Sequence, residues 1–386
     1  MTNIYSEIFL IIVGWFVLYK IAKRHWGNNK TLIYIFFITY IIDVIIVMLS
    51  ERGSMHFGDG YDYYLQGKFI LDKYGVSLST FTDIKVFINV SQSWHFVPTY
   101  EFALFQALFH STKCISIFHI IIMHCSFVVW YQIFTEFKFD KKICERATLF
   151  MILSLYLQNF TIPALKDPLV FALVSMISKY IVKFYYCRRH KILFQTIVPL
   201  TILMFTRMYV ACALIISIFI CIIMLMKKRM TIRNLIGIMG VLIVGSIIGF
   251  LLIRNGDLLT YINRWVNEYD LGIMGLIVSL IKRTLEFCFA PLIFNIMNAQ
   301  SLYYPTYIES SLRLLLCPAL IYGIISVKHV KDKELFFLIF LVPLLVSMVA
   351  LETGEQASAV RQYFQSYPLL CLLYARGTKI NRRRIE

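Results

Sequence analysis

The sequence predicts an all-α polytopic membrane protein, and three features of its composition support this class. Hydrophobic residues make up 59% of the 386 residues, whereas only 16% are charged. The mean hydropathy is +0.71, far above that of a typical soluble domain. The apolar residues form repeated runs of spanning length, which predict about 11 transmembrane helices, within a range of roughly 9 to 13. We expect one integral membrane domain over residues 1–386.

The predicted spans follow these apolar runs along the chain. Several runs are shorter than the ~20 residues of a standard span, and local thinning of the bilayer accommodates such lengths. The ranges are Ile4–Tyr19, Thr31–Leu49, Cys114–Phe134, Ala147–Ile162, Pro168–Tyr185, Ile192–Phe205, Tyr209–Met226, Leu235–Ile253, Ser311–Val327, Leu335–Ala350 and Gln362–Tyr374.

Basic residues lie in tight clusters between these runs and set the predicted orientation. Successive clusters are separated by enough apolar sequence for two membrane passes, so the positive-inside rule places all of them in the cytoplasm. The N-terminus is then expected outside and the C-terminus in the cytoplasm. The clusters are Lys20–Lys30, Lys138–Arg146, Lys183–Lys191, Lys227–Arg233, Lys328–Lys333 and Arg376–Arg384.

The net charge of +16 does not indicate a nucleic-acid-binding protein. Such binding needs a basic face on a folded soluble domain, whereas here the basic residues punctuate apolar spans. We therefore expect the lipid bilayer, and no nucleic acid, among the partners.

Two predicted outer loops are long enough to carry structure of their own. Residues 50–113 include an aromatic, amphipathic stretch from Trp94 to Phe109, and residues 254–310 include an apolar run from Leu271 to Phe294. Helices with aromatic rings on one side and charges on the other rest at the headgroup level, so both stretches are predicted to be interfacial. The second run also fits a re-entrant hairpin, which leaves the topology unchanged.

The first outer loop contains an acidic and aromatic motif that runs from His56 to Tyr64. Asp59 and Asp62 are three residues apart, so a helix that starts here would put both carboxylates on one face. One interpretation is a Gly-Asp turn followed by an interfacial helix. The other is a site where one carboxylate acts as a general base on a hydroxyl or holds a divalent cation beside a phosphate.

Aromatic and polar residues of the outer loops are candidates for binding a sugar. Tyr61, Tyr63, Tyr64 and Trp94 offer ring faces. Glu355 adds a carboxylate from the last predicted outer loop. His95 is a further candidate base, although a lone histidine is more often structural.

Three basic residues lie on the predicted outer side, against the topological bias, and are candidates for binding a phosphate. Lys166 precedes Asp167 where a span begins, and Asp167 also suits a helix cap. Arg207 stands alone in a long apolar stretch, where snorkelling is its simplest explanation. Arg361 enters the membrane at the top of the last predicted span, and a guanidinium suits bidentate phosphate contact.

The nine cysteines show no paired spacing. Disulfide and metal frameworks need such pairs, so we expect apolar packing residues instead. No cofactor is expected to be required, and a divalent cation at the acidic motif is the alternative.

Five motifs follow one another in a fixed order along the chain. They are Asp59-x-x-Asp62-Tyr63, the Trp94–Phe109 segment, Lys166-Asp167, Arg207-x-Tyr209, and Arg361-Gln362-Tyr363 followed by Tyr367-Pro368-Leu369-Leu370. This organisation resembles the membrane glycosyltransferases of the GT-C type. It is most similar to the bacterial Wzy-type polymerases of O-antigen and capsule repeat units and their EpsG-like relatives. The likeness covers nearly the whole chain, which differs from the best-described polymerases in lacking a pair of large, arginine-rich outer loops.

The resemblance implies a GT-C-like fold, an activity and a site. The expected activity polymerises oligosaccharide repeat units, carried on polyprenyl pyrophosphate, at the outer leaflet of a bacterial inner (cytoplasmic) membrane. The resemblance gives Asp59 or Asp62 the role of base or metal ligand, and it gives Arg207 and Arg361 the lipid pyrophosphate. A chain-length regulator would be a further partner beside the polyprenyl-linked oligosaccharide. Two alternatives are a transferase that adds one sugar from a polyprenyl-monophosphate donor and a flippase for the same saccharides.

Overall fold

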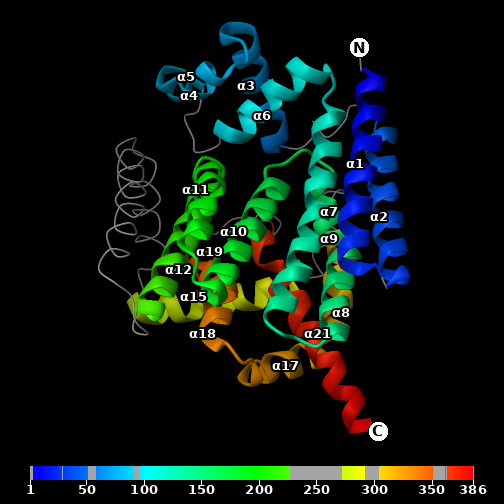
Figure 1. Ribbon diagram of the computed structural model, residues 1–386, viewed down its shortest axis with the longest axis vertical. Helices are drawn as coiled ribbons and strands as arrows, with labels where there is room; N and C mark the ends of the chain where they lie inside the picture. Colours follow the sequence, from blue (N-terminus) through cyan, green and yellow to red (C-terminus); the bar gives the residue numbers. More distant parts are fainter. Residues whose placement is uncertain are drawn as a thin grey trace.

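The computed structural model describes residues 3–27, 29–50, 58–90, 96–226, 272–291, 304–350, 361 and 363–385. Over these ranges the protein is 88% helical and contains no strand, which confirms the predicted all-α class. The helices form a bundle, and the two ends of the chain lie at opposite ends of it (Figure 1).

Five helices are apolar and long enough to cross a membrane, among the residues that the structure describes. A helix suits this environment because it satisfies its own backbone N–H and C=O groups. The bent pair α16 (Tyr304–Leu315) and α17 (Cys317–Ser326) adds a sixth if it forms one span. The predicted total of about 11 stays a prediction. The five helices are α1 (Ile4–Trp26), α2 (Lys30–Leu49), α7 (Lys113–Glu136), α10 (Asp167–Cys187) and α12 (Met208–Met226).

The predicted span Ala147–Ile162 is divided into two helices by a break at Ser154. The Ser154 side chain accepts a hydrogen bond from the backbone N–H of the third residue of the next helix. Glu309 accepts a second hydrogen bond, from the Tyr156 N–H at 2.6 Å. Side chains thus satisfy the backbone donors that a helix start exposes. The two helices are α8 (Lys141–Ile152) and α9 (Leu155–Thr161).

The predicted span Ser311–Val327 is bent by 67° where α16 meets α17. Pro318 lies in the first turn of α17. A proline has no N–H to continue the preceding helix and its ring clashes with the carbonyl four residues earlier, so α16 cannot run straight into α17. As a result, α17 lies across the end of the bundle (Figure 1).

Several shorter helices complete the described bundle. The predicted span Leu235–Ile253 lies outside the described residues, as does most of the predicted outer loop 254–310. From that loop the structure describes α15, which packs against α16 and α19. The remaining elements are α11 (His190–Met204), α15 (Gly272–Phe289), η3 (Val327–His329), α18 (Lys333–Phe336), η4 (Phe337–Leu341), α19 (Val342–Ala350), η5 (Phe364–Ser366) and α21 (Tyr367–Ile385).

Four helices between α2 and α7 form a separate layer, which we call the end layer. It lies at the end of the bundle where α1 begins (Figure 1). Its helices α3 and α6 pack closely, because Gly67 of α3 leaves room for the backbone of α6 near Thr99 and Ala103. The four helices are α3 (Gly58–Tyr74), α4 (Leu78–Thr82), α5 (Ile84–Val90) and α6 (Phe96–Phe109).

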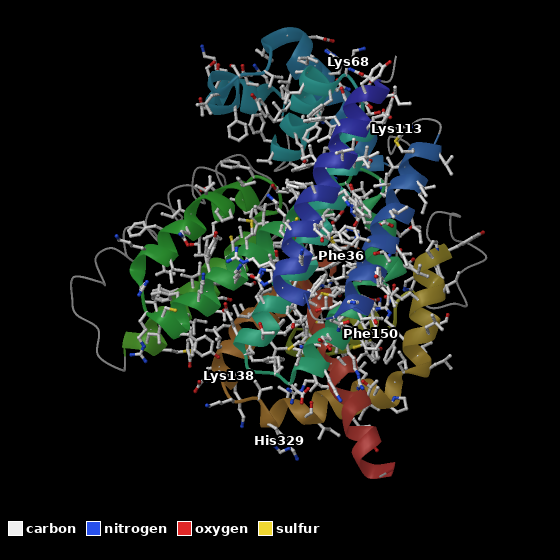
Figure 2. The ribbon with its side chains drawn as sticks, turned by 45° about the vertical axis from the view of Figure 1, so that its right-hand side comes forward. Phe36, Lys68, Lys113, Lys138, Phe150 and His329 are labelled. Carbon is white, nitrogen blue, oxygen red and sulfur yellow. The ribbon has the colours of Figure 1, made fainter. Side chains whose placement is uncertain are left out.

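The opposite end of the bundle gathers basic residues, and we call it the basic end. Lys138 and His329 lie there, far from Lys68 and Lys113 near the end layer (Figure 2). It is formed by the last turn of α1, the α7–α8 and α10–α11 turns, the start of α18 and the end of α21 (Figure 1). All but one of the basic clusters map to these places, and the cluster Lys227–Arg233 lies outside the described residues.

Helix α7 forms the centre of the packed bundle and contacts α1, α2, α8 and α10. Its Trp130 is fully buried and stacks on Phe340 with ring centroids 5.7 Å apart. At the basic end, Gly323 of α17 and Gly377 of α21 allow a closer approach, because a Cβ at either position would overlap the backbone of the other helix. Small residues at helix contacts are the usual device for close packing in membranes.

Candidate functional site

A buried carboxylate at the start of α10 binds two arginines from distant parts of the chain. Asp167 Oδ1 accepts a hydrogen bond from Arg207 Nη2 at 2.6 Å, and Asp167 Oδ2 accepts one from Arg361 Nε at 2.5 Å. The side chain of Asp167 is fully buried and that of Arg207 is 5% exposed. Lys166, the preceding residue, is also buried. We call these four side chains the Asp167 cluster.

Local structure explains how each member reaches this position. Asp167 is the first residue of α10, and Lys166 occupies the N-cap position without a side-chain capping bond. The interpretation of Asp167 as a helix cap is therefore wrong, since its carboxylate is bound by the arginines. Arg207 ends the turn between α11 and α12, where its N–H donates to the Leu203 carbonyl at 2.7 Å. Arg361 lies shortly before η5.

Neighbouring helices hold the Arg207 guanidinium in place. Arg207 Nη1 donates to Gln365 Oε1 at 3.4 Å, and Gln365 Nε2 donates to Ser347 Oγ at 2.7 Å. The guanidinium carbon also lies 5.9 Å from the ring centre of Tyr209. Residues of α12 and η5 thus contact the guanidinium and restrict its orientation, and Ser347 of α19 fixes the Gln365 side chain.

The Asp167 cluster lies where the bundle meets the end layer. Lys166 Nζ is 6.0 Å from the ring centre of Tyr63, which belongs to α3. The Val97 N–H of α6 donates to the Phe205 carbonyl at 3.4 Å, in the turn that leads to Arg207. A ligand bound here would therefore contact both the membrane bundle and the end layer.

The charge of the cluster makes it suited to an anion. Three of its side chains are cationic and one is anionic, so their formal net charge is +2. Charges in a buried place interact more strongly than in water, because the surroundings are less polar. Both oxygens of Asp167 accept from guanidiniums, which makes this carboxylate unsuited to hold a divalent cation. A phosphate or pyrophosphate offers the opposite charge and several acceptor oxygens.

The acidic motif lies on α3 from Gly58 onward, and its first two residues lie outside the described residues. Asp62 and Tyr61 are exposed, whereas Tyr63 is buried and faces Lys166. Tyr64 is half-buried and stacks on Tyr61, with ring centroids 6.4 Å apart. The backbone of Asp59 lies in the first turn of α3, and its side chain lies outside the described residues.

Three predicted site residues, Trp94, His95 and Glu355, lie outside the described residues. Of the others, the structure brings Lys166, Arg207 and Arg361 together and adds Tyr63 through its contact with Lys166. Among the described side chains, Asp62 makes no hydrogen bond or ion pair with this group. The three phosphate-binding candidates thus lie together. The described candidates for sugar binding and for the base lie on α3 in the end layer, and of these Tyr63 contacts the phosphate-binding group.

A buried acid–base pair that joins the end layer to α7 was not predicted from the sequence. Glu101 of α6 and His119 of α7 approach to 3.0 Å between Oε1 and Nε2, and His119 is almost fully buried. The pair borders the apolar cluster formed by Tyr63, Phe102 and Ala164. Glu101 Oε2 and His119 Nδ1 are buried and lack hydrogen-bond partners among the described residues. The spacing of Glu101 and His119 along the chain does not indicate a contact, because the two residues lie on different helices.

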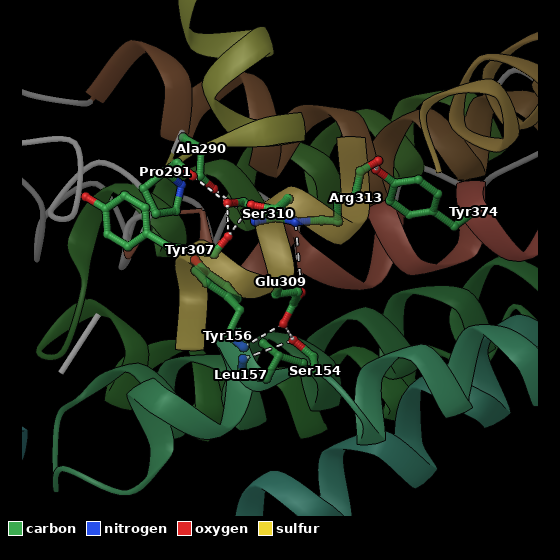
Figure 3. Close-up of polar contacts among 11 residues, drawn as sticks. Ser154, Tyr156, Leu157, Ala290, Pro291, Tyr307, Glu309, Ser310, Arg313 and Tyr374 are labelled. Carbon is green, nitrogen blue, oxygen red and sulfur yellow. Dashed lines mark hydrogen bonds and ion pairs between the residues drawn. The ribbon is translucent and has the colours of Figure 1, made fainter. Parts of the chain in front are cut away.

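A second buried ion pair lies inside α16 (Figure 3). Arg313 Nε and Glu309 Oε1 are 4.0 Å apart, one helical turn from each other. Glu309 Oε2 accepts from Ser154 Oγ at 2.9 Å as well as from the Tyr156 N–H. Arg313 Nη2 donates to the Ala290 carbonyl at 2.9 Å. These contacts tie α16 to the break between α8 and α9 and to the end of α15.

The described part of the chain contains no cluster of metal-ligating side chains. No set of three or more His, Cys, Asp or Glu side chains there is arranged to hold a metal ion.

Comparisons of the chain with family models, with curated proteins and with solved structures give no match. The function must therefore be argued from the site itself.

Proposed function

We propose that this protein is a membrane glycosyltransferase that acts on polyprenyl-(pyro)phosphate-linked saccharides at the outer leaflet of a bacterial cytoplasmic membrane. Its most favoured activity is polymerisation of the oligosaccharide repeat units of a surface polysaccharide. The observation that carries this proposal is the Asp167 cluster. It gathers Lys166, Arg207 and Arg361 around one carboxylate, between the apolar bundle and the end layer.

The distribution of charge supports the proposed sidedness. The described basic clusters share the basic end, and the positive-inside rule assigns such an end to the cytoplasm. The end layer and the Asp167 cluster then face the outer leaflet. A polyprenyl-linked sugar has its tail in the bilayer and its phosphate at the surface, so this location fits its phosphate.

The proposed reaction transfers a glycosyl group from the lipid phosphate to an acceptor hydroxyl. A carboxylate of the acidic motif, Asp59 or Asp62, removes the hydroxyl proton as the acceptor oxygen bonds to the anomeric carbon. The bond from that carbon to the phosphate oxygen breaks, and its electron pair leaves with the lipid phosphate. Arg207, Arg361 and Lys166 stabilise the negative charge that develops on this leaving group.

Aromatic rings of α3 support the binding of the saccharide. The exposed Tyr61 stacks with Tyr64 on the surface of the end layer. Ring faces of this kind suit the apolar face of a sugar. The buried Tyr63 of the same helix contacts Lys166. The helix that carries the proposed sugar-binding rings therefore packs against the proposed phosphate-binding residues.

The main test measures the length of the surface polysaccharide made by cells that depend on this protein. Arg207→Gln and Arg361→Gln are expected to reduce a ladder of polymer lengths to a single repeat unit on gels. Arg189→Gln is the matched control, because Arg189 is an exposed arginine at the basic end. Immunoblots of the membrane fraction verify that all three variants accumulate. A full ladder in both site variants would falsify the proposal.

The base is tested separately. Asp59→Asn and Asp62→Asn are made one at a time in the same cells. We expect one of them to stop polymerisation while the protein still reaches the membrane. Full-length polysaccharide in both variants would exclude the acidic motif as the source of the base.

One observation favours the flippase alternative. The bent pair α16 and α17 and its buried ion pair match the broken helices that transporters use around a substrate. The gel separates the two functions when the gene is deleted. Loss of a polymerase leaves one repeat unit on its acceptor, whereas loss of a flippase leaves none. A transferase for one sugar would instead leave a product shorter by a single residue, which mass spectrometry detects.

A further inference from the structure

A cavity of about 260 Å³ lies at the basic end, between the α7–α8 turn, the segment after α17, and α21. Its volume falls below the roughly 300–1,000 Å³ of pockets for drug-sized ligands. It therefore suits a small polar group better than an oligosaccharide. The Asp167 cluster lies next to the end layer, at the opposite end of the bundle, so the cavity is a separate site.

Basic side chains dominate the charged lining of this cavity. Lys138, Lys331 and Arg376 contribute three positive charges, and His329 adds an imidazole. Asp140 is the carboxylate of the lining, and it accepts a hydrogen bond at 2.9 Å from a backbone N–H in the first turn of α8. With His329 neutral, the formal charge of these side chains is +2. The cavity thus attracts an anion.

The central cation of the cavity is fixed in place before any ligand binds. Arg376 Nε donates to Ser326 Oγ at 2.7 Å, and Arg376 Nη2 donates to the Ser326 carbonyl at 2.6 Å. The guanidinium carbon lies 5.0 Å from the ring centre of Phe139. A guanidinium has five N–H donors, and Ser326 receives two of them. Such preorganisation lowers the entropy that a ligand loses on binding.

The neighbouring helix α17 indicates where the bilayer lies. Ile321, Ile324 and Ile325 are each about half exposed and form one face of α17. The other face packs on α21, where Gly323 meets the Leu373 carbonyl. An apolar face of this kind rests in the boundary between acyl chains and headgroups. The cavity adjoins the last residue of α17, so it lies at the headgroup level.

We propose that this cavity binds the phosphate of an anionic phospholipid. Basic pockets between transmembrane helices are known receptors for such headgroups. A soluble phosphate ester has the same anionic group, but it would gain nothing from the apolar face of α17. Bound lipid would join the α7–α8 turn, the segment after α17 and α21 through one phosphate.

The full chain, purified in detergent, is titrated with phosphatidylglycerol or phosphatidylcholine, and bound lipid is counted by native mass spectrometry. The test variant is Lys138→Gln/Lys331→Gln, since both lysines are exposed and line the cavity. The matched control is Arg189→Gln/Lys191→Gln, which removes the same charge from exposed positions of the basic end. The attraction of each basic side chain to an anionic lipid corresponds to about a fivefold change in affinity, so the test variant is expected to bind phosphatidylglycerol roughly 30-fold more weakly.

The control variant is expected to retain parental affinity, and Lys138→Arg/Lys331→Arg is expected to restore binding. Equal affinity for phosphatidylglycerol in the parent and the Gln variant would overturn the proposal. Glycerol 3-phosphate and inorganic phosphate are titrated in parallel against thermal unfolding. If either soluble anion stabilises the parent as strongly as phosphatidylglycerol does, and this stabilisation is lost in Lys138→Gln/Lys331→Gln, the assignment to a lipid is wrong.

Discussion

The Asp167 cluster and the Glu309–Arg313 pair are both buried ionic groups of the same bundle, yet they differ in charge balance. Glu309 and Arg313 are one turn apart in a single helix and neutralise each other. Their remaining contacts go to Ser154, the Tyr156 N–H and a backbone carbonyl. The Asp167 cluster instead unites three separate chain segments and carries a surplus of positive charge.

This difference separates a structural ion pair from a candidate binding site. A pair of opposite charges that also bonds to neighbouring segments fixes helices relative to one another and leaves no net charge for a ligand. The side chains of the Asp167 cluster carry a formal charge of +2, and such a group favours an anion, because charges are poorly solvated away from water. We therefore infer that Glu309 and Arg313 brace the bundle, whereas phosphate binding by the Asp167 cluster remains the proposal that the experiments below test.

The largest expected effect comes from Asp167→Ala. The substitution leaves the buried Arg207 guanidinium and the half-buried Arg361 guanidinium without their carboxylate, and breaking a buried pair in this way costs about 3–5 kcal/mol. Unfolding of the purified protein in detergent, followed by circular dichroism, measures this loss. A stability equal to that of the parent would show that the ion pairs do not hold α10 to the turn at Arg207.

Arg207→Lys is expected to impair function more than stability. Lysine keeps the positive charge but lacks the planar fork of donors, so contact with the leaving phosphate is weakened. Removing one such stabilising donor lowers rates by roughly 10²–10³-fold. Polymer formation in membranes, followed with a radiolabelled lipid-linked substrate, gives the rate. Arg313→Lys is the control and should reduce the rate far less. Equal losses of rate in both variants would show that the two ionic groups do not differ in function.

Glu309→Gln is expected to destabilise the protein without removing phosphate binding. The amide can still accept a hydrogen bond from Ser154, but Arg313 loses its counter-charge, and an unsatisfied buried group costs about 1–3 kcal/mol. Denaturant titration in detergent measures this cost. Stabilisation of the variant by pyrophosphate should match that of the parent, and loss of that response would link the pair to the binding site.

The smallest expected effect is stabilisation by a soluble anion. Pyrophosphate at about ten times its dissociation constant should raise the free energy of unfolding by about 1.4 kcal/mol, because it binds only the folded protein. The response should disappear in Arg207→Gln and persist in the control Arg189→Gln. A response that survives in Arg207→Gln would move the anion site away from the Asp167 cluster.

The apolar runs, the acidic motif and the basic residues outside the main clusters were all recognisable in the sequence, because each depends on local composition. Hydropathy over a span-length window predicts a helix in lipid wherever it occurs in the fold. The breaks at Ser154 and at Leu316 were not predicted. In the first, Glu309 reaches the backbone from a distant helix, and in the second a proline acts within a run that hydropathy alone describes as continuous.

The sequence by itself determined the all-α class, the presence of several apolar helices long enough to cross a membrane, and the chemical types of residue that could bind a phosphate. Only the tertiary structure joined Asp167 to Arg207 and Arg361, because ion pairs between residues so far apart in the chain depend on how the helices pack. The same holds for Glu101 and His119, and for the cavity around Arg376. Periodicity and hydropathy indicate which segments can form helices in a membrane, whereas the packing of those helices determines which charged side chains come into contact.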